Sequence, residues 1–273
     1  MGAIMIRTAV VGAAGKMGKT LIPLIAESVQ LKLVAAVEQP GIPAIGKDAG
    51  LNAGVSENGV LITDDLVRVV SDVDVVIDFT VAQATVLNLE ICADSGTPMV
   101  IATTGLSLAE QDRLHQIGQN QPIVFASNYS IGVNATFRLV EEAAKIFGEG
   151  VDIEIIESHH KHKVDAPSGT AISLGQYAAR ALGRDLSEVE VHGRQGQTGA
   201  RDEAAIGFHA IRGGEIVGEH KVMFISSGER LEITHRTQSR TNFGEGAVRA
   251  ATWVVSQRPG VYDMLDVLGI VKN

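Results

Sequence analysis

The sequence predicts an α/β protein in two parts, a Rossmann-type domain with a parallel sheet and an α+β substrate domain with a mainly β open sheet. Three observations predict this fold. Short apolar strands alternate with helical stretches through the first half of the chain. A glycine-rich turn directly follows the first strand. After Ser130 the strands gather together instead of alternating with helices.

The strands expected in the first half are short β-rich runs, at residues 6–11, 31–38, 74–80, 98–104 and 122–127. Helices are expected between them, from the glycine turn to about Ser28, near 82–95 and near 108–118. Pro23 predicts a kink or an early break in the first helix. Ser107 and Glu110 have capping-box spacing at the start of the last. This alternation indicates a parallel sheet that is covered on both faces.

The second half begins with a predicted helix at 132–147, whose apolar stripe is Val133, Phe137, Val140, Ala144 and Phe147. Strands are expected at 151–157, 205–212, 215–226 and 229–236, with one helix at about 169–182. The polar, glycine-rich segment 193–204 predicts a mobile loop or arm. A last helix is expected at 241–257, packed back on the first domain. We therefore predict a dinucleotide-binding domain formed by 1–130 and 241–273, and a substrate-binding and oligomerisation domain at 131–240.

The composition excludes several classes of protein. The 273 residues carry a formal charge of −9, which argues against general binding to nucleic acid. No apolar stretch approaches the ~18 residues of a membrane span, and Arg7 interrupts the N-terminal run, which predicts a strand rather than a signal peptide. Cys92 is the single cysteine, so an intrachain disulfide is impossible and a reducing compartment is indicated. We expect a cytoplasmic protein.

The glycine turn places Gly12, Gly15 and Gly18 between the first strand and the first helix. The spacing is GxxGxxG rather than GxGxxG, and a plain strand–helix turn is the alternative. A dinucleotide site is favoured because Glu38 ends the second strand, where an acidic residue accepts hydrogen bonds from an adenosine ribose. The later strands end in small polar residues, at the sheet edge where ligands of such folds bind. These residues are Thr80, Thr103, Thr104, Ser127 and Asn128.

The segment 157–170, ESHHKHKVDAPSGT, gathers histidine and lysine in an acidic protein. A metal site is one interpretation, but adjacent imidazoles rarely converge and the lysines repel a cation. A solvated basic loop is another. An anionic substrate is favoured, because histidinium and ammonium groups bind carboxylates through charge-assisted hydrogen bonds. The helix that starts after Pro167 adds backbone amides that suit a carboxylate, and histidine can also transfer a proton near neutral pH.

Seven stretches together carry a resemblance to a known family over nearly the whole chain. They are GAAGKMGK, VIDFT, ATTG, FASNYSIGVN, EIIESHHKHKVDAPSGTA, IGFHAIRGGEIVGEHKVMF and GERLEITHR. The chain resembles the bacterial 4-hydroxy-tetrahydrodipicolinate reductase family, also called dihydrodipicolinate reductase. The resemblance implies reduction of a cyclic dicarboxylate with NADH or NADPH, loss of water, a place in diaminopimelate and lysine biosynthesis, and a homotetramer joined through the substrate-domain sheets.

The resemblance also implies roles for particular residues. His159 matches the catalytic histidine and Lys163 the proton-donating lysine of the family. His160, Gly169 and Thr170 match its substrate contacts. The matched cofactor positions are Gly12, Ala13, Ala14, Gly15, Lys16, Met17, Glu38, Gln39, Ala102, Thr103, Thr104, Ala126, Ser127, Asn128 and Tyr129.

Two positions depart from the family pattern. Ala102 stands where relatives often have glycine, and its extra methyl group should be tolerated. Gln39 stands where relatives often have a basic residue after the ribose-binding acid, so a partner for the 2′-phosphate of NADPH is missing there. We therefore expect NADH to serve at least as well as NADPH.

Two other functions compete with this interpretation. A semialdehyde dehydrogenase would need a nucleophilic thiol, whereas Cys92 lies within a predicted helix and is expected in the core. A nucleotide-sensing protein without catalysis would keep the glycine turn and Glu38, but it would have no use for the histidine–lysine segment.

Overall fold

The computed structural model describes residues 5–270. The chain forms two compact units, one from Met1–Ile131 with Arg240–Asn273 and one from Gly132–Ser239. Each unit has its own sheet, in agreement with the predicted combination of a Rossmann-type parallel sheet and a second, mainly β sheet.

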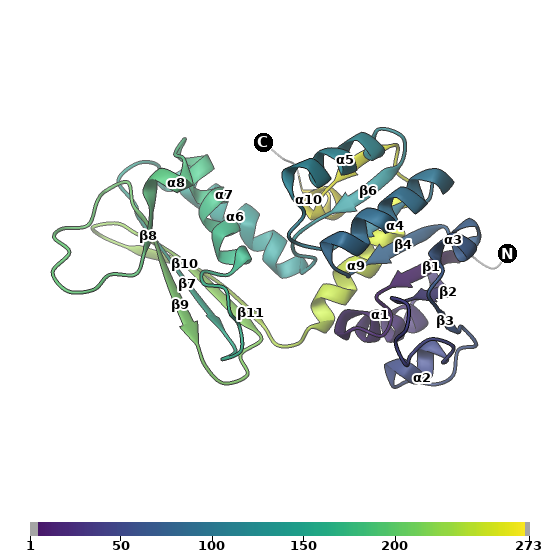
Figure 1. Ribbon diagram of the computed structural model, residues 1–273. Helices are drawn as coiled ribbons and strands as arrows, with labels where there is room; N and C mark the ends of the chain where they lie inside the picture. The colour runs from purple at the N-terminus through teal and green to yellow at the C-terminus, as the bar shows by residue number, and fades with distance from the viewer. Residues whose placement is uncertain (1–4, 271–273) are drawn as a thin grey trace. The chain divides into compact units, whose positions relative to one another are not determined.

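The first unit is built on a parallel sheet of seven strands (Figure 1). In spatial order these are β12 (Gly260–Tyr262), β6 (Pro122–Phe125), β5 (Met99–Ile101), β4 (Val75–Asp78), β1 (Ile6–Val11), β2 (Leu31–Val37) and β3 (Ile62–Thr63). The order reverses between β1 and β4, so the chain turns from one half of the sheet to the other there. Ligands of such folds bind beyond the strand ends at this switch point.

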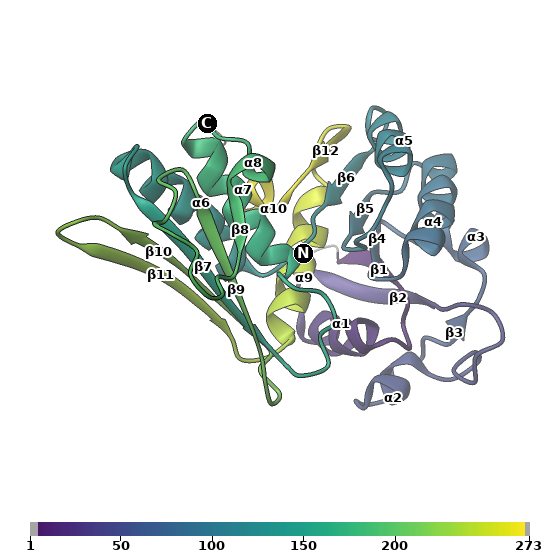
Figure 2. The same cartoon turned by 60° about the vertical axis from the view of Figure 1, so that its left-hand side comes forward.

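Helices cover both faces of this sheet (Figure 2). One face packs against α1 (Lys16–Glu27), α9 (Thr241–Val254) and α10 (Met264–Leu268). The other face packs against α3 (Leu66–Val69), α4 (Ala82–Ser95) and α5 (Leu108–Gly118). The C-terminal helices thus complete the core of the first unit, because α9 buries Ala247, Ala250 and Val254 against the sheet.

Local sequence rules account for most helix ends in this unit. Ser107 and Glu110 form the expected capping box at the start of α5. A kink or an early break was expected at Pro23, and the early break is wrong, since α1 continues to Glu27. The helix buries Leu21, Ile22 and Ile25, and this packing offsets the loss of one backbone hydrogen bond. Short elements were not expected: α2 (Ala49–Ala53), the 3₁₀ turn Val70–Asp72, α3, α10, β3 and β12.

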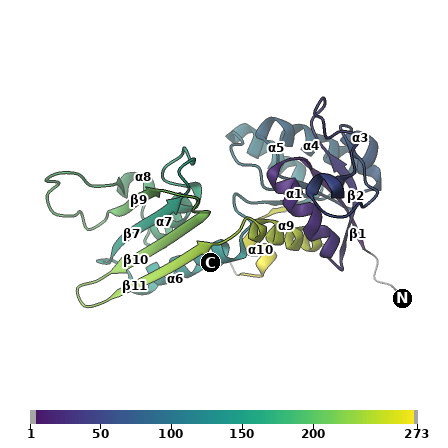
Figure 3. The ribbon, with the colours of Figure 1, turned by 90° about the horizontal axis from the view of Figure 1, so that it is seen from below.

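The second unit contains a mixed sheet of five strands (Figure 3). In spatial order these are β11 (Arg230–Thr237), β10 (Gly218–Ile225), β7 (Asp152–His159), β9 (Ile206–Arg212) and β8 (Glu190–His192). β7 pairs antiparallel with β10 and parallel with β9. β8 and the short α8 (Leu186–Val189) lie in a region where no such element was expected.

One face of the second sheet is covered by α6 (Ile131–Phe147) and α7 (Gly169–Ala181). Phe137 and Val140 of α6 pack there with Ile153 and Ile155 of β7. Because neighbouring strand residues point to opposite faces, Glu154, Ile156 and their cross-strand neighbours form the other face. Within residues 5–270, the helices of this unit's hydrophobic core pack on the first face only.

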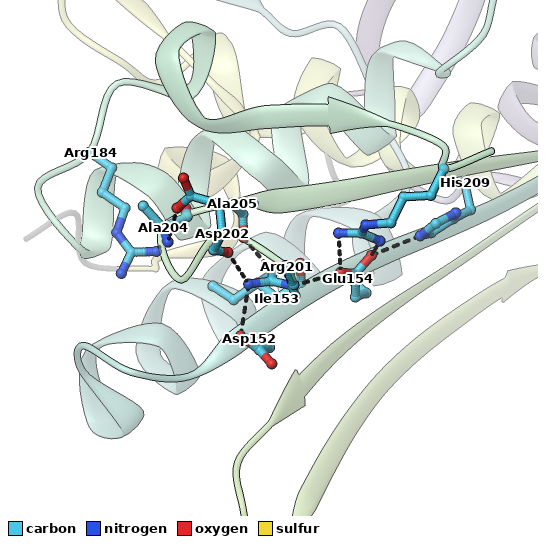
Figure 4. Close-up of polar contacts among 10 residues, drawn as sticks. Asp152, Ile153, Glu154, Arg184, Arg201, Asp202, Ala204, Ala205 and His209 are labelled. Carbon is cyan, nitrogen blue, oxygen red and sulfur yellow. Dashed lines mark hydrogen bonds and ion pairs between the residues drawn. The ribbon is translucent and has the colours of Figure 1, made fainter. Parts of the chain in front are cut away.

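The segment 193–204 contains no helix or strand, and two of its arginines converge on Glu154 of β7 (Figure 4). Arg194 donates two hydrogen bonds to the Glu154 carboxylate, at 2.9 and 3.1 Å. Arg201 donates a third at 3.0 Å, and its guanidinium also binds Asp152 at 2.7 Å. His209 adds a contact of 2.7 Å. The loop is therefore attached to the sheet near both of its ends.

Candidate active site

The residues predicted to hold a cofactor all follow the carboxyl ends of parallel strands in the first unit. Gly12–Met17 follow β1, and Glu38 and Gln39 follow β2. Ala102–Thr104 follow β5, and Ala126–Tyr129 follow β6. Because carboxyl ends of parallel strands share one edge of the sheet, the structure brings these segments to the same side.

The glycine turn is shaped for close approach of a ligand to the backbone. Gly12 has a φ of +76°, which side-chain-bearing residues rarely adopt. A Cβ at Gly18 would lie 2.3 Å from the Gly12 carbonyl oxygen, so only glycine lets α1 pack against the turn. Gly15 caps α1 without a side-chain hydrogen bond, and the first turn carries no acidic residue. The start of α1 is thus suited to an anion such as a pyrophosphate.

Glu38 lies against the same turn. One carboxylate oxygen accepts a hydrogen bond from the Ala14 amide at 3.0 Å, and the other accepts from the Gln39 amide at 2.9 Å. The side chain is only partly buried. The expected ribose-binding acid and the glycine turn are therefore in contact, and these residues fit a dinucleotide.

A buried network lies between the ends of β4 and β5. The fully buried Asp78 accepts hydrogen bonds from the Thr80 hydroxyl at 2.6 Å and from the Asn88 amide at 3.0 Å. Thr103 is also buried and accepts a bond of 2.7 Å from Thr85. The side chain of Thr103 supports the edge from within, while Thr104 is exposed.

Tyr129 differs from the other predicted cofactor positions. Its side chain is 2% exposed, and its hydroxyl donates to the carbonyl oxygens of Ile101 and Val124. Burial raises the pKa of the phenol well above its usual value. The side chain therefore belongs to the core of the first unit.

In the second unit, the histidine–lysine segment lies at the end of β7 and in the loop before α7. Glu157, near the end of β7, is 1% exposed and pairs with Arg212 of β9 at 2.7 Å in a bidentate ion pair. The same carboxylate contacts His159 Nδ1 at 2.6 Å and accepts a bond from the Ser168 amide at 3.1 Å. Burial raises the pKa of this carboxyl, but the bonds from His159 and Arg212 outweigh burial and lower it to about 2.

The start of α7 is fixed by Ser168, whose hydroxyl accepts a bond from the Ala171 amide at 3.2 Å. The same hydroxyl lies 2.9 Å from Nε2 of His220 on β10. Burial, followed by the charge of nearby His159, lowers the pKa of His220 to about 3, so this imidazole is neutral. The predicted substrate residues Gly169 and Thr170 form the first turn of the helix.

The other predicted residues of the loop are more accessible. Lys163 is partly buried and pairs with the exposed Asp165 at 2.9 Å. Its backbone amide bonds the His160 carbonyl at 3.1 Å, closing a tight turn. The rings of His160 and His162 are 6.2 Å apart. Within residues 5–270, no group of three or more His, Cys, Asp or Glu side chains is arranged to bind a metal.

Sequence reasoning missed Arg212 and His220, and it gave Glu157 no role. Arg212 and His220 come 55 and 52 residues after their partners Glu157 and Ser168 in the chain. The only sequence signal was a charged or polar residue on an otherwise apolar strand, which is weak by itself.

Cys92 is fully buried in α4, and burial raises the pKa of its thiol to about 12. A thiol with such a pKa is not a nucleophile at neutral pH. The alternative of a thiol-dependent semialdehyde dehydrogenase is therefore disfavoured by the structure.

Family models match both halves of the chain. The model described as "Dihydrodipicolinate reductase, N-terminus" matches residues 6–129, and "Dihydrodipicolinate reductase, C-terminus" matches residues 132–268. The chain belongs to the dihydrodipicolinate reductase family. It is therefore an oxidoreductase of a family that uses a nicotinamide cofactor.

Curated relatives agree with membership of the dihydrodipicolinate reductase family. The chain is 52% identical over 264 residues to a 4-hydroxy-tetrahydrodipicolinate reductase of Acinetobacter baumannii, covering 97% of this chain and 96% of the relative. It is 53% identical over 264 residues to the enzyme of that name from Alkalilimnicola ehrlichii, covering 97% and 99%. These matches span nearly the full length of both proteins.

Solved structures show the same fold. A dipicolinate-bound dihydrodipicolinate reductase from Paenisporosarcina sp. TG-14 superposes with a TM-score of 0.77 at 24% identity, covering 96% of this chain and 99% of that one. A probable dehydrogenase from Thermotoga maritima gives a TM-score of 0.64 at 12% identity, covering 97% and 93%. Among the described residues, no helix is long and apolar enough to cross a membrane.

Proposed function

We propose that residues 157–170 form the substrate site at which this chain reduces 4-hydroxy-tetrahydrodipicolinate to tetrahydrodipicolinate, with loss of water, in diaminopimelate and lysine biosynthesis. The family match and the curated relatives support the reaction. The observation that supports the site is the contact of 2.6 Å between His159 and the ionised Glu157, beside the start of α7.

The substrate is a dicarboxylate, and the loop offers groups that suit both carboxylates. Lys163 supplies an ammonium whose present partner, Asp165, is exposed. Such a surface ion pair is worth little, so a substrate carboxylate can replace it. The first turn of α7 supplies the backbone of Gly169 and Thr170 at the positive end of the helix. We assign His160 as a further substrate contact.

We assign to His159 and Lys163 the donation of a proton to the substrate as it is reduced. Histidine and lysine side chains are common general acids, and His159 is fixed through one ring nitrogen, which leaves the other for the substrate. Glu157, Arg212 and His220 hold this arrangement from three neighbouring strands.

The cofactor is assigned to the strand ends of the first unit. The start of α1 would face the pyrophosphate, and Glu38 the adenosine ribose. The bound nicotinamide supplies the hydride for the reduction. We propose that NADH serves at least as well as NADPH, because Gln39 is neutral and Lys16 is the nearest cation of the turn.

We also propose a homotetramer held mainly by strands between 205 and 236. The open face of the second sheet carries exposed apolar side chains such as Ile211, which is 50% exposed. β11 is an edge strand with Leu231 40% exposed. Exposed edges and apolar faces of sheets favour association. A cytoplasmic location is part of the same proposal and rests on the pathway and the single cysteine.

The direct test is oxidation of NADH or NADPH, followed by absorbance, in the presence of enzymatically generated 4-hydroxy-tetrahydrodipicolinate. Pyridine-2,6-dicarboxylate, a planar relative of the substrate, should inhibit competitively with the dicarboxylate. Thr170→Val should weaken this inhibitor by about 1 kcal/mol, through loss of a hydroxyl partner. Absence of turnover, or density for the inhibitor away from residues 157–170, would contradict the proposal.

A further inference from the structure

We infer that Glu157 is a positioning residue of this reduction: its carboxylate keeps the hydrogen of His159 on Nδ1 and leaves Nε2 as the ring nitrogen that meets the substrate. The inference rests on the proposed function, because it takes His159 as catalytic. Glu157 is 1% exposed, so its carboxylate acts through the histidine rather than by contact with the substrate.

The contacts of Glu157 leave little freedom for the imidazole. One carboxylate oxygen accepts from His159 Nδ1 at 2.6 Å and from Arg212 Nη1 at 2.7 Å. The other accepts from Arg212 Nη2 at 2.7 Å and from the Ser168 amide at 3.1 Å. An ionised carboxylate can only accept hydrogen bonds. Nδ1 of His159 must therefore carry the hydrogen.

The second ring nitrogen has a different environment. Within residues 5–270, Nε2 of His159 has no hydrogen-bond partner. The His159 side chain is 11% exposed. Its near neighbour on β10 is Gly218, where an added Cβ would lie 3.2 Å from Nε2. Glycine at this position keeps the nitrogen accessible. A neutral imidazole with hydrogen on Nδ1 presents Nε2 as an acceptor, and the protonated ring presents it as a donor.

The charged and titratable groups around the pair come from each neighbouring element. Hydrogen bonds from His159 and from Arg212 of β9 keep Glu157 ionised, and the Arg212 guanidinium also bonds the Asp165 carbonyl at 2.6 Å. His220 of β10 lies edge-on to His159, with ring centroids 5.2 Å apart. Lys163 and Asp165 pair in the following loop. His235 of β11 adds to the charges that act on His220.

β7 provides a matched control. Glu154, on the opposite face of the same strand, is also buried, pairs with arginine, and contacts a histidine at 2.7 Å. Burial raises its pKa, but hydrogen bonds from Arg194, His209 and Arg201 lower it to about 2. Its partners belong to the loop 193–204 and to β9, and none of them is assigned to catalysis or substrate binding. Glu154→Gln and Glu157→Gln therefore remove the same buried charge with different expected consequences.

The experiment compares the full-length variants Glu157→Gln, Glu157→Asp and Glu154→Gln with wild type in steady-state assays. Glu157→Gln should lower kcat at least tenfold, since wrong orientation of a catalytic histidine is costly, with KM for the nucleotide unchanged. Glu157→Asp keeps the charge and should recover part of kcat. The kcat of Glu154→Gln should stay within about twofold of wild type, even if this variant lowers thermal stability as much as Glu157→Gln does.

A second readout follows the hydrogen itself. Protein with ¹⁵N-labelled histidine would be measured by solid-state NMR at alkaline pH, where imidazoles are neutral. The His159 signals would be identified as those that disappear in His159→Gln. We expect hydrogen on Nδ1 in wild type and in Glu154→Gln, and a change of tautomer in Glu157→Gln. An unchanged tautomer, or equal losses of kcat in both glutamine variants, would overturn the inference. Full activity of His159→Gln would instead contradict the proposed function.

Discussion

Ser168 and His220, 52 residues apart in the chain, are joined by a hydrogen bond of 2.9 Å between the serine hydroxyl and Nε2 of the histidine. Both side chains are buried. Ser168 also caps α7, and Glu157 accepts a bond from its amide. The first turn of α7, the neutral His220 and the His159–Glu157 pair are therefore parts of one hydrogen-bonded cluster.

Removal of the Ser168 hydroxyl should affect both stability and ligand binding. Ser168→Ala should lower the free energy of unfolding by about 1–2 kcal/mol, because a helix cap is lost and a buried histidine loses its partner. Ser107→Ala is the control, since Ser107 caps α5 in the other unit. Both variants should be destabilised in denaturant titrations. Only Ser168→Ala should weaken inhibition by pyridine-2,6-dicarboxylate; equal inhibition constants would disconnect the cap from the site.

Acid should remove the stabilisation that Glu154 and Glu157 provide. The pKa of each carboxyl is lowered from 4.5 to about 2 in the folded chain. The unfolded chain therefore binds more protons, and the stabilisation is present above pH 4.5 and lost as the pH falls toward 2. Each carboxylate contributes on the order of 3 kcal/mol.

The measurement is the difference in the free energy of unfolding between wild type and Glu154→Gln or Glu157→Gln, at several pH values. The difference should be largest near neutral pH and shrink steadily below pH 4.5. A difference that is constant down to the acid limit would show that the charge of these carboxylates does not stabilise the fold.

Cofactor preference should respond to residue 39. In the proposed cofactor site, Glu38 would repel a 2′-phosphate, and Gln39 offers no charge against it. Gln39→Arg should shift the ratio of kcat/KM for NADPH over NADH by about 1–2 kcal/mol if a charge-assisted pair forms. Gln30→Arg, which adds the same charge before the amino end of β2, is the control. A wild-type preference for NADPH of about tenfold, unchanged by Gln39→Arg, would mean that other groups bind the phosphate.

Association should depend on the open face of the second sheet. Ile211→Asp should dissociate the proposed tetramer, because it places a charge in the proposed apolar contact. Leu139→Asp alters an equally exposed apolar residue on α6, which lies on the covered side of the same sheet, and should leave the tetramer intact. Sedimentation velocity at micromolar concentration separates these outcomes. A monomeric wild-type protein would refute the proposed assembly.

The sequence predicted those features that depend on contiguous residues. The strand, glycine turn and helix around Gly12 are local, and the capping box at Ser107 needs only four residues. The fold class followed because buried parallel strands are short apolar runs. The break expected at Pro23 failed because packing of Leu21, Ile22 and Ile25 outweighs a local preference.

Features that depend on long-range pairing could not be predicted in this way. β12 becomes a strand only because Val261 and its neighbours pair with β6. The role of Glu157 depends on Arg212, which reaches it from the adjacent strand β9. The burial of the Tyr129 ring is likewise set by the surrounding core, and a motif match to the cofactor site could not reveal it.

The catalytic roles of His159 and Lys163 are tested by the turnover of His159→Gln and Lys163→Ala, with Lys161→Ala, an exposed lysine in the same loop, as the control. We expect a loss of ~10²–10⁴-fold in kcat for the first two variants, because acid–base groups are removed. Lys161→Ala should keep nearly wild-type turnover, and all three variants should bind the nucleotide as wild type does. A turnover above about half of the wild-type rate in either His159→Gln or Lys163→Ala would contradict the assigned site.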